Sequence, residues 1–236
     1  MAAIVYTAIF GDYDTLKQPV TQTEPCDFIC FSDKRMPARV GAWRIIRVKP
    51  DRNDLPLESR RLKLLSHRVF PNGRLAWRYA PFSTRPRCDL LIWIDGSVSI
   101  NNPAFVQDMR AEVGSHDWAV FAHPDRDCIY DEALAILAIP RHQGLPVLSQ
   151  TEAYRSVVPS HGGLYASGII VRRQPAPARL NQINDRWWLE LQKWTYRDQL
   201  SLPYVLRAVG GGDPVKIRGH LWLNKWFKVL PHGGVS

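Results

Sequence analysis

The chain has 236 residues, of which 45% are hydrophobic and 22% are charged, and its net charge is +9. This composition is ordinary for a globular protein, and a chain of this length can bury a core without disulfides or a structural metal. No stretch is apolar for long enough to cross a bilayer, which excludes a membrane-spanning protein.

The positive charge is concentrated in one segment, residues 44–87. This basic segment holds 12 Lys and Arg against three acids, so its net charge of +9 equals that of the whole chain. Such a segment suits a phosphate group, a nucleic acid or an anionic lipid surface, and a solvated helix face accounts for part of the excess. We take it as the candidate for peripheral contact with a membrane.

Periodicity of apolar residues predicts an alternation of strands and helices. We expect strands at 4–10, 27–31, 43–48 and 89–94, and a helix at 59–70 that ends at Pro71-Asn72-Gly73. The elements expected further along are a helix at 103–113, a strand at 118–121, an irregular stretch at 123–160 with one helix near 131–139, a strand at 164–172 interrupted by Gly168, helices at 178–194 and 198–209, and an aromatic, basic tail at 215–236.

This alternation predicts one α/β domain over residues 1–236, with a mostly parallel central sheet flanked by helices on both faces. In such sheets, ligands bind beyond the carboxyl ends of the strands. Several polar residues follow predicted strands directly, and they are Asp12, Asp14, Asp33, Asp95 and His123.

The cysteines and the N-terminus indicate the compartment. The four cysteines form no CxxC pair and no zinc pattern, so we expect reduced, mostly buried thiols. The first residues lack the basic segment and the long apolar run of a secretory signal. We therefore expect a cytoplasmic protein, able to contact the inner face of a membrane from its surface.

Asp95 is the sharpest single signal in the sequence. It follows an apolar run directly, Gly96 lets a ligand approach the backbone, and Ser97 supplies a second oxygen two residues on. A hard divalent cation binds such oxygens together with those of a diphosphate. The alternative is an Asp that only caps the following turn.

The segment around Asp95 resembles the Asp-x-Asp motif of glycosyltransferases with the GT-A fold, with Ser97 in place of the second acid. More closely, the chain resembles the TOD1/MUCI70-type glycosyltransferase-like family. The segments that carry this resemblance are Tyr6-Thr7-Ala8-Ile9-Phe10-Gly11-Asp12-Tyr13-Asp14, Leu62-Lys63 with His67 and Phe70-Pro71-Asn72, Trp93-Ile94-Asp95-Gly96-Ser97, His123-Pro124-Asp125-Arg126-Asp127-Cys128-Ile129-Tyr130, Gly163-Leu164-Tyr165-Ala166-Ser167-Gly168, and Arg197-Asp198-Gln199.

The resemblance implies a GT-A-like nucleotide-diphospho-sugar transferase domain, with residues 1–100 as the nucleotide-binding half and 101–236 as the acceptor-binding half and tail. Its donor would be a UDP- or GDP-sugar. The residues it assigns to the donor are Phe10, Gly11, Asp12, Tyr13, Asp14, Asp33, Arg60, Lys63, His67, Asp95 and Gly96. Turn chemistry is an equal alternative for Asp12 and Asp14. Arg60, Lys63 and His67 share a helix face that suits a diphosphate.

A Mn²⁺ or Mg²⁺ ion is the implied cofactor, held by Asp95, Ser97 and a histidine of the tail. His220 and His232 are both candidates, and we favour His220. Ser97 stands where the motif has its second acid, and one carboxylate binds a cation less firmly than two. We therefore expect weaker cation binding than in proteins that have both acids.

The implied acceptor is a glycan, a polysaccharide or a lipid-linked sugar. The residues assigned to it are His123, Arg126, Tyr130, Tyr165, Ser167 and Gly168. Asp198 and Gln199 are the catalytic candidates. If Asp198 removes the acceptor proton the reaction inverts, whereas Gln199 against the reacting face favours retention. Asp198 as a helix cap is the alternative.

Two other functions compete with the transferase. The first is a metal-dependent hydrolase of the amidase or ceramidase kind, in which Asp95, His123 and His220 form a mixed-ligand site. No HExxH or GxSxG motif supports it. The second is a nucleic-acid-binding module that uses the basic segment 44–87, for which no recognised binding motif appears. We expect no nucleic-acid partner.

Overall fold

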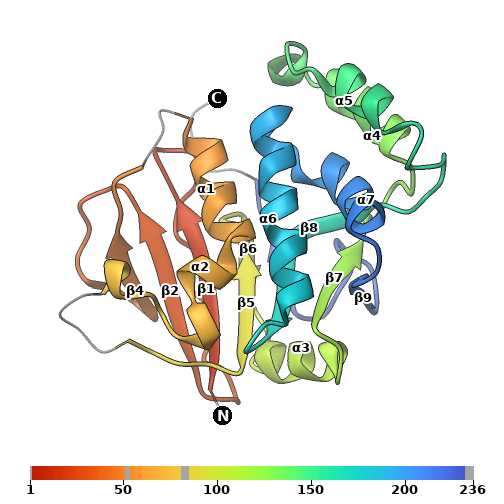
Figure 1. Cartoon of the computed structure of the whole chain (residues 1–236). Helices are drawn as coiled ribbons and strands as arrows, with labels where there is room; N and C mark the ends of the chain where they lie inside the picture. The colour runs from red at the N-terminus through yellow and green to blue at the C-terminus, as the bar shows by residue number, and fades with distance from the viewer. Residues whose placement is uncertain (1, 51–53, 81–84, 232–236) are drawn as a thin grey trace.

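The computed structural model describes residues 2–50, 54–80 and 85–231, and an eight-stranded sheet forms the centre of this part of the chain. The strands of this sheet are β1 (Ala3–Ile9), β2 (Cys26–Ser32), β3 (Arg39–Val40), β4 (Trp43–Arg47), β5 (Leu90–Ile94), β7 (Trp118–Ala122), β8 (Tyr165–Arg173) and β9 (Val215–Ile217). Their order across the sheet is β3-β4-β2-β1-β5-β8-β7-β9 (Figure 1).

The centre of the sheet is parallel, as the sequence predicted. β1 pairs in parallel with β2 and β5, and β2 pairs in parallel with β4. β8 runs antiparallel to both β5 and β7, and β9 is parallel to β7. Every residue of β1 and β5 is buried, which is the pattern of strands covered on both faces. The carboxyl ends of β1 and β5 therefore lie side by side at one edge of the sheet.

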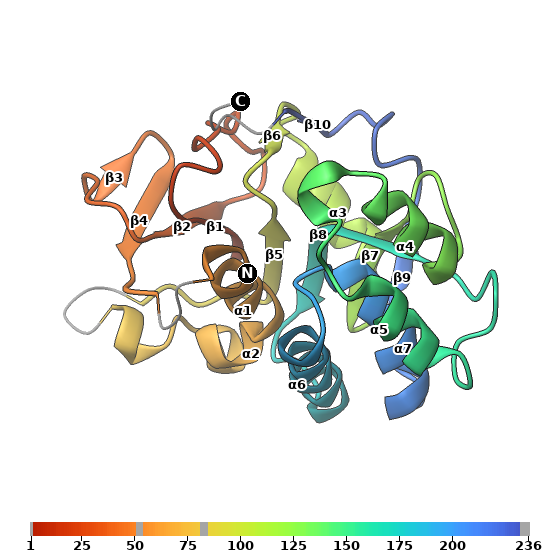
Figure 2. The same ribbon diagram turned by 90° about the horizontal axis from the view of Figure 1, so that it is seen from above.

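Helices cover both faces, and each face has its own apolar core. The helices on one face are α1 (Leu55–Leu64), α2 (Ser66–Val69), α6 (Ala178–Lys193) and α7 (Asp198–Val209), and the elements on the other are α3 (Phe105–Val113) with the antiparallel pair β6 (Val98–Ile100) and β10 (Phe227–Val229) (Figure 2). Tyr6, Trp93 and Trp187 belong to the first core, whereas Val5 and Phe105 belong to the second. This is the layered arrangement expected of a GT-A-like domain.

The helix expected at 59–70 begins earlier and is divided. Asp54 caps it, because its carboxylate accepts a hydrogen bond from the backbone N–H of Leu57 at 3.0 Å. Leu65 then leaves helical geometry between α1 and α2. Arg60 and Lys63 consequently lie on α1, while His67 lies on the separate helix α2.

The stretch 123–160 is more regular than expected. It contains α4 (Ile129–Leu137), a short 3₁₀ turn at Pro140–His142 and α5 (Val147–Tyr154). α5 has no clear apolar periodicity in the sequence, because two of its four buried positions are polar, Gln150 and Thr151. Those two side chains are satisfied internally, for example by Thr195, whose hydroxyl donates to Gln150 Oε1 at 3.1 Å.

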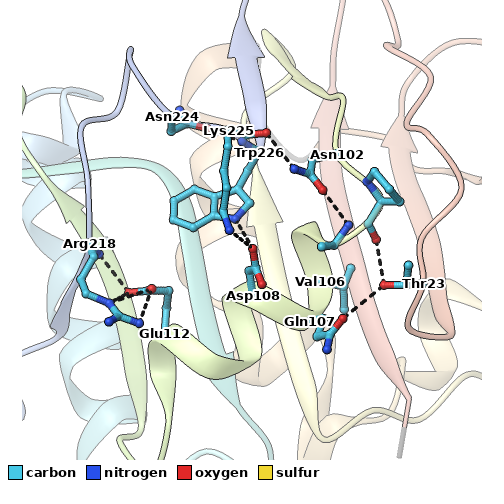
Figure 3. A network of polar contacts seen from close by, with 12 residues as sticks. Thr23, Asn102, Val106, Gln107, Asp108, Glu112, Arg218, Asn224, Lys225 and Trp226 are labelled. Carbon is cyan, nitrogen blue, oxygen red and sulfur yellow. Dashed lines mark hydrogen bonds and ion pairs between the residues drawn. The ribbon is translucent and has the colours of Figure 1, made fainter.

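The C-terminal tail is fastened to α3 at both ends of a short loop (Figure 3). Arg218 forms an ion pair with Glu112 at 3.0 Å, and Lys225 forms one with Asp108 at 2.8 Å. The indole N–H of Trp226 also donates to Asp108, at 2.7 Å. The loop between these anchors carries Leu221 and Trp222 back toward the carboxyl ends of the central strands.

Among the described residues, no helix combines the length and apolar character needed to cross a bilayer.

Candidate functional site

A cavity of about 660 Å³ opens at the carboxyl ends of β1 and β5. Its walls come from the loop after β1, the turn after β5, the N-termini of α1 and α7, the start of β8, and the tail. The predicted site residues that line it are Phe10, Gly11, Asp12, Tyr13, Asp14, Arg60, Asp95, Gly96, Ser97, Ser167, Gly168, Asp198 and Gln199. Most of the residues assigned from the sequence thus meet in one place, although they come from both halves of the chain.

Asp95 faces this cavity from the end of the central strand. Its Oδ1 accepts hydrogen bonds from the indole N–H of Trp93 at 2.7 Å and from the ammonium of Lys63 at 3.3 Å. The side chain is 28% exposed. Its backbone N–H donates to the carbonyl of Gly168 at 2.8 Å, which ties the end of β5 to β8. One oxygen is therefore held in place, and the carboxylate as a whole remains accessible to a ligand.

Lys63 is a buried cation behind the cavity wall. Its ammonium lies 2.6 Å from Asp198 Oδ2, 3.3 Å from Asp95 Oδ1 and 3.1 Å from the hydroxyl oxygen of Ser167. The side chain is only 1% exposed. Lys63 therefore joins α1, β5, β8 and α7, and it is not one of the residues that line the cavity.

Asp198 is ionised in this setting. Burial alone would raise the pKa of its carboxyl, but the charges of Lys63 and Arg60 outweigh burial and bring the pKa down to about 2. A carboxylate of this kind accepts hydrogen bonds strongly at neutral pH. It is a weak general base, because efficient bases have a pKa near the working pH.

Arg60 supplies a second cation, and this one does line the cavity. Its Nε lies 3.5 Å from Asp198 Oδ2, and its side chain is 23% exposed. Burial works against its charge, but Asp198 and Asp95 outweigh burial and raise its pKa. The guanidinium is thus a permanent positive charge beside the two carboxylates.

The loop after β1 is anchored by a hydrogen bond to Asp33. The backbone N–H of Gly11 donates to Asp33 Oδ1 at 3.1 Å, and Gly11 adopts a φ of 58°, which favours glycine. Asp33 supports this loop from the end of β2 and does not line the cavity. Tyr13 lies on the rim and is 51% exposed.

Two glycines of the cavity wall, Gly96 and Gly168, lie beside carboxylate oxygens. A Cβ atom on Gly96 would lie 3.0 Å from Asp14 Oδ2, and one on Gly168 would lie 3.6 Å from Asp95 Oδ2. Glycine at both positions therefore leaves room beside the carboxylates of Asp14 and Asp95, and Ser97, which also lines the cavity, is buried. Within the described ranges, the cavity has no group of three or more His, Cys, Asp or Glu ligand atoms within 4.8 Å of one another. A cation here would need further oxygens from a bound ligand.

Several predicted residues lie outside this cavity. His67 pairs with Asp185, with Nε2 3.2 Å from Oδ1, so it does not share a surface with Arg60 as we expected. His220 does not line the cavity either, and its Nδ1 accepts from the backbone N–H of Trp222 at 3.2 Å. His232, the other tail candidate, lies outside the described residues.

On the acceptor side, Ser167 and Gly168 line the cavity, and the other four candidates do not. Arg126 donates to Glu132 at 2.7 Å, which makes it part of an ion-pair cluster. His123 lies beside the same carboxylate, with Nε2 3.6 Å from its oxygen. The hydroxyl of Tyr130 donates to a backbone carbonyl at 2.6 Å, and Tyr165 sits at the start of β8.

Sequence reasoning missed part of the wall. The further polar and aromatic residues that line the cavity are Ser59, Arg141, His142, Tyr196 and Arg197. Ser59 lies within α1, Arg141 and His142 lie in the 3₁₀ turn, and Tyr196 and Arg197 lie between α6 and α7. None of them follows a strand, so the rule that led to Asp95 does not reach them. Tyr196 and His142 contact each other, with the hydroxyl 3.1 Å from Nδ1. Burial is the main cause that lowers the pKa of His142.

Several described residues of the basic segment 44–87 pair with acids of the fold. Arg60 lines the cavity and Lys63 is buried behind its wall, while Arg61 pairs with Glu58 at 2.9 Å and Arg68 pairs with Asp185 at 2.6 Å. Part of the excess charge that the sequence shows is therefore neutralised within the fold.

Comparison with known proteins agrees with this architecture. The family model described as the TOD1/MUCI70 glycosyltransferase-like domain matches residues 1–228, and the chain therefore belongs to this family. It is similar to "Alkaline ceramidase TOD1" of Arabidopsis thaliana, at 25% identity over 236 aligned residues that cover 86% of the chain and 47% of that protein. It is also similar to "Probable hexosyltransferase MUCI70" of the same plant, at 23% identity over 233 residues that cover 86% of the chain and 36% of that protein. The chain thus spans less than half of either relative.

Proposed function

We propose that this member of the TOD1/MUCI70 glycosyltransferase-like family transfers a sugar from a nucleotide-diphosphate donor, a UDP- or GDP-sugar, to a hydroxyl group of a glycan, polysaccharide or glycolipid. The observation that carries the proposal is the position of Asp95. It stands at the carboxyl end of the central strand, in the wall of a cavity large enough for such a donor, and it is ionisable and partly exposed.

The donor would enter along the loop after β1. Its nucleoside would lie against Phe10, Gly11 and Tyr13, with Asp12 and Asp14 able to accept hydrogen bonds from ribose or base. The diphosphate would then reach Arg60, whose guanidinium matches phosphate geometry. Lys63 is too deeply buried for direct contact with the phosphates, and we assign it the support of Asp95 and Asp198 instead.

A Mn²⁺ or Mg²⁺ ion would be held by Asp95 and Asp14, with Ser97 beside them. When bound, it supplies positive charge to the phosphate oxygens of the departing nucleoside diphosphate. The chain adds the fixed charge of Arg60 to the same group, in a cavity partly shielded from water.

In the transfer itself, an acceptor hydroxyl oxygen forms a bond to the anomeric carbon of the donor sugar. The bond from that carbon to the diphosphate breaks, and the nucleoside diphosphate leaves with the electron pair, while the hydroxyl proton passes to a phosphate oxygen of this leaving group or to water. Asp198 and Gln199, at the N-terminus of α7, would bind the hydroxyls of the reacting sugar. We place Asp198 in this orienting role because its pKa of about 2 makes it a weak base.

An amide hydrolase is the second candidate function, because the relative TOD1 is described as an alkaline ceramidase. An amide hydrolase of the kind considered from the sequence would use Asp95, His123 and His220. Neither histidine lines the cavity, so among the described residues this ligand set is not assembled there. The transferase therefore accounts better for the geometry of the site.

One experiment separates the two functions. We would screen UDP- and GDP-sugars by thermal shift with and without Mn²⁺, and then assay the best donor for nucleoside diphosphate release with glycan acceptors. In parallel, a ceramide would be assayed for release of fatty acid. The proposal expects stabilisation by a nucleotide sugar and acceptor-dependent release of the nucleoside diphosphate. Fatty-acid release with no nucleotide-sugar binding would overturn it.

A further inference from the structure

We propose that the chain has a zinc site, formed by Cys128, Asp131 and His161, that is separate from the cavity. A thiol sulfur, a carboxylate oxygen and an imidazole nitrogen from these residues all lie within 4.8 Å of one another. In the part of the chain that the structure describes, no other group of three His, Cys, Asp or Glu residues meets this condition. None of the three lines the cavity, so the site is not part of the donor-binding wall.

The fold brings the three ligands together from two segments. Cys128 is the N-cap residue of α4, and Asp131 follows three residues later in the first turn of this helix. His161 comes from the loop that leads into β8. The N–H of Gly163 donates to the carbonyl of Asp127 at 2.8 Å, and the hydroxyl of Tyr130 donates to the carbonyl of Val158 at 2.6 Å. These bonds fix the loop against α4 without a metal.

The imidazole of His161 is already oriented by a carboxylate. Its Nδ1 lies 2.7 Å from Asp127 Oδ1. Histidines that bind metals commonly use one ring nitrogen for the metal and the other for a carboxylate or carbonyl. Asp127 would therefore fix the ring and leave Nε2 for the cation.

The ligand types at this site favour Zn²⁺ over the Mn²⁺ or Mg²⁺ that we propose for the cavity. A thiolate and an imidazole are the ligands of Zn²⁺, whereas Mg²⁺ and Mn²⁺ prefer oxygen. Cys128 is 2% exposed, while Asp131 and His161 are exposed, so the site has a buried thiol on one side and solvent on the other. Three protein ligands leave a fourth position for water.

The site can be tested with Co²⁺, a spectroscopic substitute for Zn²⁺, added to the full chain after treatment with a chelator. We expect binding of about one equivalent, with an intense near-ultraviolet thiolate-to-cobalt band and the visible bands of a tetrahedral ion, and we expect Zn²⁺ to displace it. Cys128→Ser should abolish the ultraviolet band, and Cys26→Ser should leave it intact. Asp95→Asn should also leave it intact, which separates this test from that of the transferase.

A second pair of variants covers the case in which Cys128→Ser folds poorly. His161→Ala changes an exposed residue and should remove most of the cobalt affinity, while Asp127→Asn should reduce it by about tenfold to a hundredfold. Absence of a thiolate band in the unmodified protein, or a band that survives Cys128→Ser or His161→Ala, would overturn the proposal and identify the cluster as an adventitious grouping.

Discussion

The ammonium of Lys63 lies 2.6 Å from the carboxylate of Asp198, and both side chains are almost fully buried. The pair connects α1 to the first residue of α7 across the back of the cavity. The same ammonium also contacts Asp95. One cation therefore neutralises part of the charge of two carboxylates that we propose contact the ligand. Arg60 adds the charge that faces the cavity. Lys63 therefore stabilises the two carboxylates from behind, whereas Arg60 is placed to contact the ligand.

Replacing Lys63 by methionine should destabilise the protein by about 3–5 kcal/mol, because it removes the nearer cation of the buried Asp198 carboxylate and leaves only Arg60, whose Nε is 3.5 Å away. The measurement is urea-induced unfolding at neutral pH. Adding Asp198→Asn to this variant should restore part of the loss, since it removes the orphaned charge. A loss below about 1 kcal/mol for Lys63→Met would mean that the pair is solvated rather than buried.

Asp198 should make stability depend on acid pH. Its pKa is lowered from 3.8 to about 2 in the folded protein. The stabilisation from this shift is complete above pH ~4 and is lost as the pH falls from ~4 to ~2, and it amounts to about 2 kcal/mol. Denaturant unfolding at several pH values in this window should show a shallower loss of stability in Asp198→Asn than in the unmodified protein. Parallel curves for the two proteins would contradict the shift.

Arg60→Gln should lower kcat/KM for the nucleotide sugar by about a hundredfold, because it removes a fixed donor from the leaving diphosphate. Arg61→Gln is the matched control, since Arg61 is the next residue on α1 but pairs with Glu58 and does not line the cavity. Its kinetics should stay within about twofold of the unmodified enzyme. Equal effects of the two substitutions would show that net charge, rather than position, matters.

Asp95→Asn should weaken nucleotide-sugar binding in the presence of Mn²⁺ by about a hundredfold and should remove the difference between measurements with and without the ion. Isothermal titration calorimetry measures both quantities. Asp117→Asn serves as the control, because Asp117 is exposed beside β7 and does not line the cavity. Cation-dependent binding that persists in Asp95→Asn would reject the assignment of Asp95.

Trp222→Ala should raise KM for the donor or the acceptor by about tenfold, because a cavity-lining indole offers a face for a base or a sugar ring. The chain offers a close control in Trp77→Ala. The two indoles are similarly exposed, at 52% for Trp222 and 58% for Trp77, but Trp77 is not in the cavity wall. Steady-state kinetics with varied donor and varied acceptor would show which substrate depends on Trp222. Unchanged KM values for both would remove it from the site.

The sequence predicted the parallel centre of the sheet and the cavity at its carboxyl ends because strand residues buried on both faces leave an unmistakable apolar run. Asp95 and Gly11 follow such runs directly, so their place at the sheet edge could be inferred from position alone. α1 begins before the predicted residue 59, because Asp54 caps the helix and a proline occupies its first turn.

Other features of the site depend on tertiary contacts that the spacing of residues in the sequence does not reveal. Lys63 appeared as a diphosphate ligand because it shares a helix with Arg60, and only packing against β5 and α7 places its ammonium behind the wall. The cysteine count gave no zinc pattern, since His161 joins Cys128 through tertiary contacts rather than a fixed interval. Tyr196 and His142 meet only in the tertiary structure, since Tyr196 lies between α6 and α7 and His142 lies in the 3₁₀ turn before α5.

The fastening of the tail to α3 also has a consequence for how the protein can be shortened. β9 pairs with β7 and stands at the end of the sheet, so the segment after Asp213 shields the backbone amides and carbonyls of β7. Deleting it would create an open strand edge, which invites pairing between molecules and insolubility. It would also strip one wall from the cavity. Fragments that omit this segment would therefore report on aggregation rather than on catalysis.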